Sequence, residues 1–284
     1  MSHASVRKPG PALAGRLGRL PGRLGWAGRW LVLIAGVFAW QGWADGRRSV
    51  FFPPPSAILA NMYHWWFSGP ASHLWLTSVG SGNILPSLYR MGIALGIAIV
   101  VGLPLGIVIG RSAAVAEYLE PLMHFARSIP PVAVVTVFIV LFKLGTEMEV
   151  AFITFGIIWP ILLNTIDGAR TVDPLQVETA RVFHLSNRQR IFKVMVPATL
   201  PKFFAGLRIS VSLTLILMVV AELTGSTNGI GYLMNAASEG YNMLQLWSGV
   251  VLLGILGYVL NAATLLIEHR VLAWHRGARR LTSN

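Results

Sequence analysis

Long apolar runs without charge dominate the pattern of hydrophobic and polar positions. Residues 93–109 and 213–221 contain no charged side chain. A soluble domain would divide its apolar residues between strands and helix faces, whereas uninterrupted runs of this kind suit lipid. The pattern therefore predicts an all-α fold in a polytopic membrane protein.

About six transmembrane helices follow, because each span needs roughly 20 predominantly apolar residues. We place them near 24–43, 86–110, 119–142, 149–166, 198–221 and 246–268. The first could be mistaken for a signal peptide, but it lacks a small-residue cleavage site and its Trp residues are typical of membrane interfaces. Pro130 and Pro131 in the third span and Pro160 in the fourth predict that these two helices are kinked, tilted or shielded by neighbouring helices.

The distribution of positive charge predicts the orientation. Lys and Arg total 23, and the formal net charge is +12. With six spans and both termini in the cytoplasm, all but Arg47, Arg48, Arg90 and Lys143 lie on the cytoplasmic side. Residues 1–23 and 271–284 are then basic cytoplasmic tails, the first predicted to be disordered. Because the charge borders apolar segments, we expect membrane lipids and no nucleic acid as partners.

Two segments are predicted to lie outside the membrane. The region 24–85 joins the first span to a periplasmic piece in which Pro53–Pro55 precede a short amphipathic helix near 56–67. Residues 224–244 form a Gly-, Ser- and Asn-rich loop that could meet an external partner. A plain solvated connector is an equal alternative for both.

Motifs of catalysis and metal binding are missing from the sequence. There is no cysteine, and the seven histidines are scattered without an HExxH pair, so no metal site is expected. An intramembrane enzyme would need a GxSxG nucleophile with a facing histidine, or paired aspartates. No phosphate loop of the form GxxxxGK[ST] occurs. We therefore expect no enzyme activity and no cofactor in this chain.

The most informative segment connects the fourth and fifth spans over 167–197. Asp173 can cap a helix that begins at Pro174, and Ser186 with Gln189 forms the capping box of a second. The two helices meet near His184, and both are amphipathic. We call this pair, residues 173–197, the elbow, because it would offer a rigid surface to a soluble partner. A DNA-reading helix-turn-helix is the alternative, but a loop tethered at both ends to a membrane would dock poorly in a groove.

The elbow carries a family resemblance. Its ETA at Glu178–Ala180, with Ile191, Pro197 and Pro201 at the usual spacing, resembles the EAA loop of bacterial ABC importer permeases. The segments 51–59, 128–135 and 159–174 (FFPPPSAIL, SIPPVAVV and WPILLNTIDGARTVDP) are similar to the branch serving nitrate, taurine and alkanesulfonates. The resemblance spans about 50–270, with 86–270 as the permease core.

The resemblance implies a type I ABC importer-like permease fold in the bacterial inner membrane. It implies a second permease copy, expected to make a homodimer, two ATPase subunits that bind ATP–Mg, and a periplasmic or lipid-anchored solute-binding protein. The solute would be small and anionic or zwitterionic. The ATPase-coupling residues would be Asp173, Glu178, Thr179, Ala180, Arg181, His184 and Pro197.

Two positions depart from the family pattern. Thr179 stands where alanine is usual, and His184 where glycine would ease a left-handed turn. Glu178 also has a simpler interpretation, since the helix dipole favours an acid near a helix start without any partner.

Ionisable residues inside the spans are candidates for the translocation path, because burying them in lipid is costly. We assign Arg90, Arg127, Asn164 and Glu222 to that path. Snorkelling to the headgroups is the alternative for Arg90 and Glu222, and neutralising the break at Pro130 is favoured for Arg127. Gly92, Gly96, Gly102, Gly106 and Gly110 predict close helix packing in the second span.

A membrane scaffold or assembly protein without transport activity is the remaining alternative. It agrees with the composition but leaves the capped elbow unexplained. ATP-dependent uptake with a partner would separate the two hypotheses.

Overall fold

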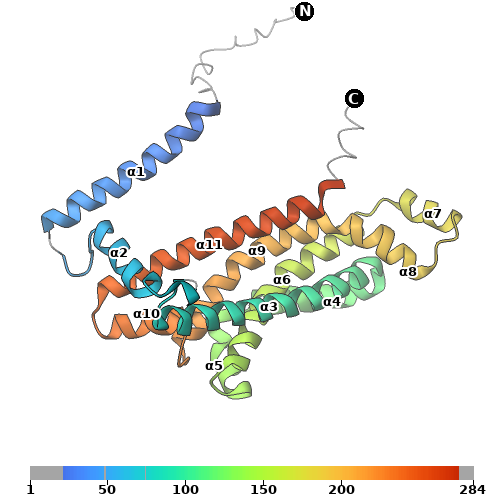
Figure 1. Ribbon diagram of the computed structural model, residues 1–284. Helices are drawn as coiled ribbons and strands as arrows, with labels where there is room; N and C mark the ends of the chain where they lie inside the picture. Colours follow the sequence, from blue (N-terminus) through green and yellow to red (C-terminus); the bar gives the residue numbers. More distant parts are fainter. Residues whose placement is uncertain (1–21, 48, 74, 275–284) are drawn as a thin grey trace, which may run out of the picture. The chain divides into compact units, whose positions relative to one another are not determined.

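Helices and connecting turns make up the part of the chain that the computed structural model describes, residues 22–47, 49–73 and 75–274 (Figure 1). No β-strand occurs within these ranges, as the all-α prediction requires. The predicted tails at 1–23 and 271–284 lie largely outside the described residues. The chain divides into two units, residues 1–56 and 57–284.

The first unit consists of helix α1 (Gly22–Arg47) and the Pro-rich segment after it. Trp43 meets Phe52 edge to face with ring centroids 5.9 Å apart. The Gln41 side chain accepts a hydrogen bond from the Ser56 N–H at 3.0 Å and donates to Asp45 at 2.9 Å. These contacts fold the Pro-rich segment back along the end of its own helix.

The second unit is built on α3 (Ser78–Arg111), α6 (Thr146–Arg170), α9 (Val196–Leu223) and α11 (Met243–Val271). Helix α6 packs between α3 and α9. Its residues Phe152, Ile153, Ile157 and Ile161 are completely buried. Pro160 leaves α6 continuous, since neighbouring helices surround it.

Glycines set the approach of α3 to α6. A Cβ on Gly106 would lie 2.6 Å from the Thr165 Cβ, and one on Gly110 would lie 2.6 Å from the Ile166 carbonyl oxygen. Gly102 faces Ile161 in the same way. Lipid competes for apolar surface, so such close packing, rather than exclusion of water, holds the two helices together. Gly92 and Gly96 face open space within the described chain, so the predicted close packing is not made there inside this subunit.

The third predicted span is two helices. Helices α4 (Ala113–Ser128) and α5 (Pro131–Phe142) are bent by 95° at the break between them. Pro131 occupies the first turn of α5, where its missing N–H costs nothing, and Pro130 directs the preceding residue away from helical geometry. The expected kink is therefore a full change of direction.

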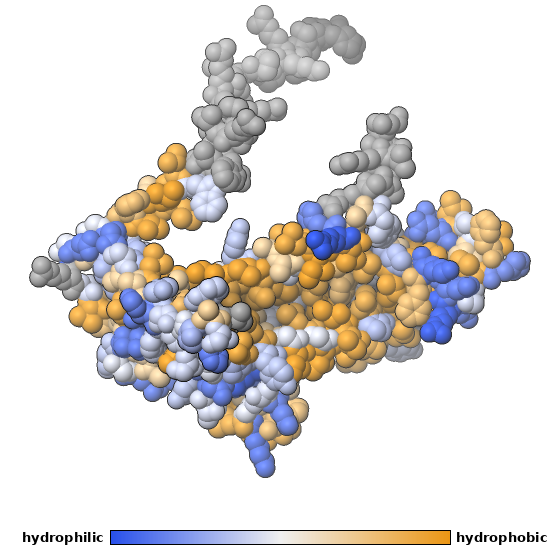
Figure 2. Space-filling view, in the orientation of Figure 1, coloured by the Kyte–Doolittle hydropathy of each residue, from blue (hydrophilic) through white to orange (hydrophobic). Residues whose placement is uncertain are grey.

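Four helical segments in the described ranges are long and apolar enough to cross a membrane: residues 71–111, 146–170, 187–223 and 243–271. The bent α4–α5 pair makes five if it counts as one span. The first predicted span, 24–43, coincides with α1, which is helical but does not belong to this set. Figure 2 shows the broad hydrophobic surface along α9 and α11 that suits contact with lipid chains.

The two predicted outer segments contain more structure than expected. Helix α2 (Pro55–Met62) continues as a π-helical turn, η1 (Tyr63–Phe67), which confirms the predicted short helix, and a 3-10 turn, η2 (Ala71–His73), follows. Trp66 is completely buried and packs with Ile84 and Leu252. The supposed loop 224–244 contains α10 (Ile230–Glu239), so the plain-connector alternative is wrong for both.

Candidate functional site

The elbow begins with a capped helix, α7 (Pro174–Val182). The Asp173 carboxylate accepts a hydrogen bond from the Leu175 N–H at 2.9 Å, and Pro174 occupies the first helical position. This arrangement satisfies one of the free N–H groups at the start of the helix. The predicted start of the elbow is confirmed.

His184 makes the turn at the tip of the elbow. Its φ of 51° lies in the left-handed region that favours glycine. The His184 N–H donates to the Arg181 carbonyl at 2.9 Å, and the Leu185 N–H donates to the Ala180 carbonyl at 3.0 Å. This pair of bonds is the Schellman helix ending, in which glycine usually takes the position of His184. The departure noted in the sequence therefore falls on a strained position.

The second arm of the elbow is joined to a membrane helix. Ser186 and Gln189 form both bonds of the predicted capping box before α8 (Asn187–Arg190). A π-helical turn, η3 (Ile191–Met195), follows and leads directly into α9. One helical run therefore extends from Asn187 at the elbow to Leu223 at the opposite end of the bundle.

One face of α7 is fixed to the protein and the other is exposed. Val177 and Ala180 are buried, whereas Leu175, Val182 and Phe183 are exposed, Phe183 to 74%. Figure 2 shows hydrophobic and strongly hydrophilic residues side by side at this end. A rigid helix that presents large apolar side chains among charges has the character of a protein interaction surface.

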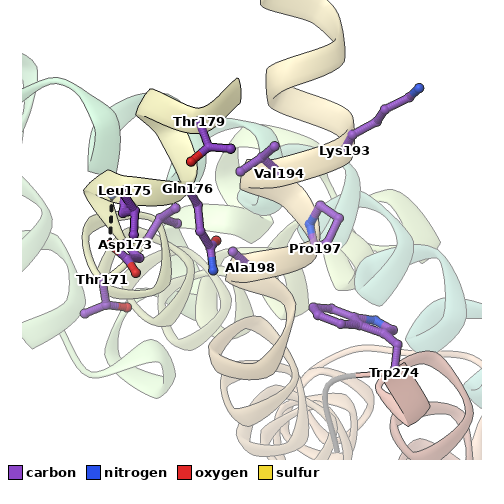
Figure 3. A pocket seen from close by; sticks show the side chains of 11 residues that line it. Thr171, Asp173, Leu175, Gln176, Thr179, Lys193, Val194, Pro197, Ala198 and Trp274 are labelled. Atoms are coloured by element: carbon purple, nitrogen blue, oxygen red, sulfur yellow. Dashed lines mark hydrogen bonds between the residues drawn. The ribbon is translucent and has the colours of Figure 1, made fainter. Parts of the chain in front are cut away.

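A hollow of about 560 Å³ lies between α7 and the start of α9 (Figure 3). Thr179, Gln176 and Asp173 line one side, and Pro197 and Ala198 line the other. Trp274, the last residue of the described chain, also lines the hollow and lies below Pro197 in Figure 3. The two arms of the elbow are therefore separated by a space that opens to the surface.

The structure brings most of the predicted coupling residues to one place. Asp173, Thr179 and Pro197 line the hollow, while Glu178 is exposed beside it. Ala180 is buried on the inner face of α7, where the helix packs against the rest of the protein. Arg181 and His184 lie at the tip, and Arg181 faces the α3 side of the elbow.

A buried charge cluster lies at the opposite end of the bundle. It consists of Arg90, Glu149 and Glu222, whose exposed fractions are 4%, 0% and 1%. Arg90 Nη1 donates to Glu222 Oε1 at 2.8 Å, and Arg90 Nε forms an ion pair with Glu149. These residues belong to α3, α6 and α9, so the cluster connects the three central helices.

The same cluster anchors α10. Glu222 Oε2 accepts a hydrogen bond from the Gly231 N–H at 2.8 Å, and Ser87 accepts one from the Ile230 N–H at 3.0 Å. Arg90 Nη2 donates to Asn228 Oδ1 at 2.7 Å. Gly229, at φ 121°, permits this approach, because a Cβ there would lie 2.3 Å from the Glu222 carboxyl carbon. A carboxylate from α9 thus caps the N-terminus of α10.

The four predicted path residues occupy three different places. Arg90 and Glu222 pair with each other inside the protein, so the snorkelling interpretation is wrong for both. Arg127 is exposed at the end of α4, and no hydrogen bond or ion pair holds it among the described residues. Asn164 is half-buried on α6 and donates to the Pro160 carbonyl at 2.8 Å.

Glu149 is the residue of this cluster that the sequence reasoning missed. It stands at the first position of the fourth predicted span, where an acid should have been treated as costly. No group of three His, Asp or Glu side chains in the described ranges is arranged as a metal site.

Comparison with known proteins decides the family. Residues 102–273, more than half of the chain, match the model of the binding-protein-dependent transport system inner membrane component. The chain belongs to this family. The matched region contains the elbow and most of the predicted core at 86–270.

Similar proteins include other permeases of this family. The permease is 32% identical over 193 residues to the aliphatic sulfonates transport permease SsuC of Bacillus subtilis, covering 68% of this chain and 70% of that one. It is 26% identical to the taurine permease TauC of Escherichia coli, with 80% and 81% covered. It is 32% identical to the nitrate import permease NrtB of a Synechocystis strain, with 83% and 85% covered.

The permease also shares its fold with a solved importer. The structure of the MetNI methionine ABC transporter in an inward-facing conformation matches with a TM-score of 0.58 and 20% identity. The match covers 66% of this chain and 94% of that chain. The predicted permease fold is confirmed.

Proposed function

We propose that this permease forms the translocation path of an ATP-driven ABC importer and couples to a separate ATPase through the elbow. The observation that carries the proposal is the exposure of Leu175, Val182 and Phe183 on a helix whose ends are capped and whose other face is buried. Such a surface can enter a groove of a partner without first becoming ordered.

The continuity of the second arm with α9 suggests how force is transmitted. When two ATPase subunits close on ATP–Mg, the elbows bound to them move with them. Because residues 187–223 form one helical run, a displacement at the elbow tilts α9 as a unit. Glu222, near the far end of α9, carries the movement to α3, α6 and α10 through the charge cluster.

The proposed path lies between two copies of the permease. One subunit has too few helices to enclose a solute, so a homodimer is the simplest arrangement. Arg127 and Asn164 stay candidates for contact with the solute. Arg90 and Glu222 are engaged with each other and would act by holding the helices together at the end of the path.

The proposed solute is small and anionic or zwitterionic. The names of the similar permeases refer to aliphatic sulfonates, taurine and nitrate, which share these properties. A solute-binding protein outside the membrane would select among them. The proposed location is the bacterial inner membrane with the elbow and both termini in the cytoplasm, α1 serving as the first span.

Reconstitution in liposomes with the ATPase and the binding protein of the same importer tests the proposal. Uptake of radiolabelled taurine or an alkanesulfonate should require ATP inside the vesicle, on the side where the ATPase is bound to the elbow. A complex that assembles stably but carries none of these solutes, nitrate included, would favour the scaffold alternative.

A further inference from the structure

A second hollow at the elbow end, of about 420 Å³, lies between the end of α3 and the elbow. Three arginines line it, namely Arg111 from α3, Arg181 from α7 and Arg190 from α8. No Asp or Glu is among the residues of its lining. The hollow therefore concentrates positive charge from the end of α3 and from both arms of the elbow.

The charge in this hollow has no counterpart within the hollow itself, although Arg111 also borders a neighbouring hollow that is lined by Glu117 and Glu120. Within the described ranges, none of the three arginines forms an ion pair. Arg190 donates to Asn187 through Nη2, but its Nε is buried and has no hydrogen-bond partner. A buried donor without a partner is costly, and three like charges around one space repel. An anion in the hollow would relieve both penalties.

Apart from Ser112 and Asn187, the remaining lining is apolar. Ile107 and Val108 stand one turn before Arg111, and Met195 faces them from η3. The candidate span of α3 ends at Arg111, which puts the arginines at the level where a span meets the headgroups. A ligand that fits has an anionic group at the membrane surface and a hydrocarbon part below it.

We infer that this hollow binds an anionic phospholipid, with its phosphate between Arg111, Arg181 and Arg190 and its acyl chains along the exposed Val108 and Ile191. Guanidinium groups suit phosphate because their N–H groups can donate in pairs. Basic pockets at the ends of membrane helices recognise lipid headgroups for this reason. The bound lipid would connect the end of α3 to both arms of the elbow.

Lipid titration of the purified full-length permease tests the inference. Binding of phosphatidylglycerol and of phosphatidylcholine would be measured in detergent by native mass spectrometry. We expect the wild-type permease to prefer phosphatidylglycerol. The double variant Arg111→Gln, Arg190→Gln should bind phosphatidylglycerol about 30-fold more weakly, or about fivefold for each arginine removed. Arg188→Gln is the matched control, since Arg188 is exposed on the same short helix but does not line the hollow.

Several results would overturn the inference. Equal binding of the two lipids, or an equal loss with Arg188→Gln, would mean that only the general positive charge attracts lipid. Displacement by millimolar inorganic phosphate would assign the hollow to a soluble anion instead. A double Arg→Lys variant keeps both charges and should retain more affinity than the Gln variant; the same loss in both would indicate damage to the fold rather than removal of a phosphate contact.

Discussion

Arg90 on α3 and Glu222 on α9 form a buried ion pair at 2.8 Å, although 132 positions separate them in the sequence. Glu149 approaches the same guanidinium from α6. One cation therefore stands between two carboxylates where the three central helices meet.

Removing the cation of this cluster should destabilise the permease strongly. Arg90→Gln leaves Glu149 and Glu222 buried without a positive partner, which costs about 3–5 kcal/mol of the free energy of unfolding. Thermal unfolding in detergent measures the loss. Arg127→Gln is the control, because Arg127 is exposed and unbonded among the described residues, and it should change stability by less than about 0.5 kcal/mol. Similar losses in the two variants would contradict the structural role of the cluster.

The tip of the elbow should become more stable when His184 is replaced by glycine. The left-handed conformation costs a residue with a Cβ roughly 1–2 kcal/mol, which glycine avoids at some cost in chain entropy. We expect a net gain of up to about 1 kcal/mol. Hydrogen exchange of the Leu185 amide, which bonds to Ala180, should then slow about fivefold.

Val182→Gly is the matched change for this test. Val182 is the last residue of α7 and has helical geometry, so glycine there should cost about 0.5 kcal/mol and speed the same exchange. If both glycine substitutions change the exchange rate in the same direction, the left-handed conformation of His184 does not determine the stability of the tip.

The glycines of α3 should respond differently to alanine. In Gly106→Ala the new methyl group would meet the Thr165 side chain at 2.6 Å, and overpacking of this kind costs about 1–3 kcal/mol. Gly96→Ala places the same methyl group in open space and should be neutral or slightly stabilising. Thermal unfolding of the two variants in one detergent makes the comparison. A loss with Gly96→Ala as large as that with Gly106→Ala would mean that helix contact does not explain the difference.

Local signals in the sequence predicted the elbow well. Asp173, Ser186 and Gln189 act within three residues of their partners, so their caps follow from sequence spacing alone. The strain at His184 could be anticipated for the same reason, since the end of a helix fixes the geometry of the next residue. The apolar runs likewise placed α6, α9 and α11 to within a few residues, whereas α3 begins at Ser78, well before the predicted start at 86.

Contacts between distant segments could not be predicted in this way. Nothing near Arg90 in the sequence identifies Glu149 or Glu222 as its partner, so a polar residue in a span had several interpretations. Helix α10 was missed because its start is stabilised by Glu222 and Ser87 rather than by a local cap. The change of direction after Ser128 exceeds what two prolines alone would indicate.

Association of the permease with the ATPase of the same importer tests the central claim most directly. Co-purification in lipid would compare wild type, Glu178→Arg on the exposed elbow, and Glu147→Arg, which changes another exposed glutamate at the opposite end of the bundle. We expect Glu178→Arg to weaken association at least about tenfold, or about 1.4 kcal/mol, while Glu147→Arg binds as wild type does. Undiminished association and ATPase stimulation with Glu178→Arg would contradict coupling through the elbow.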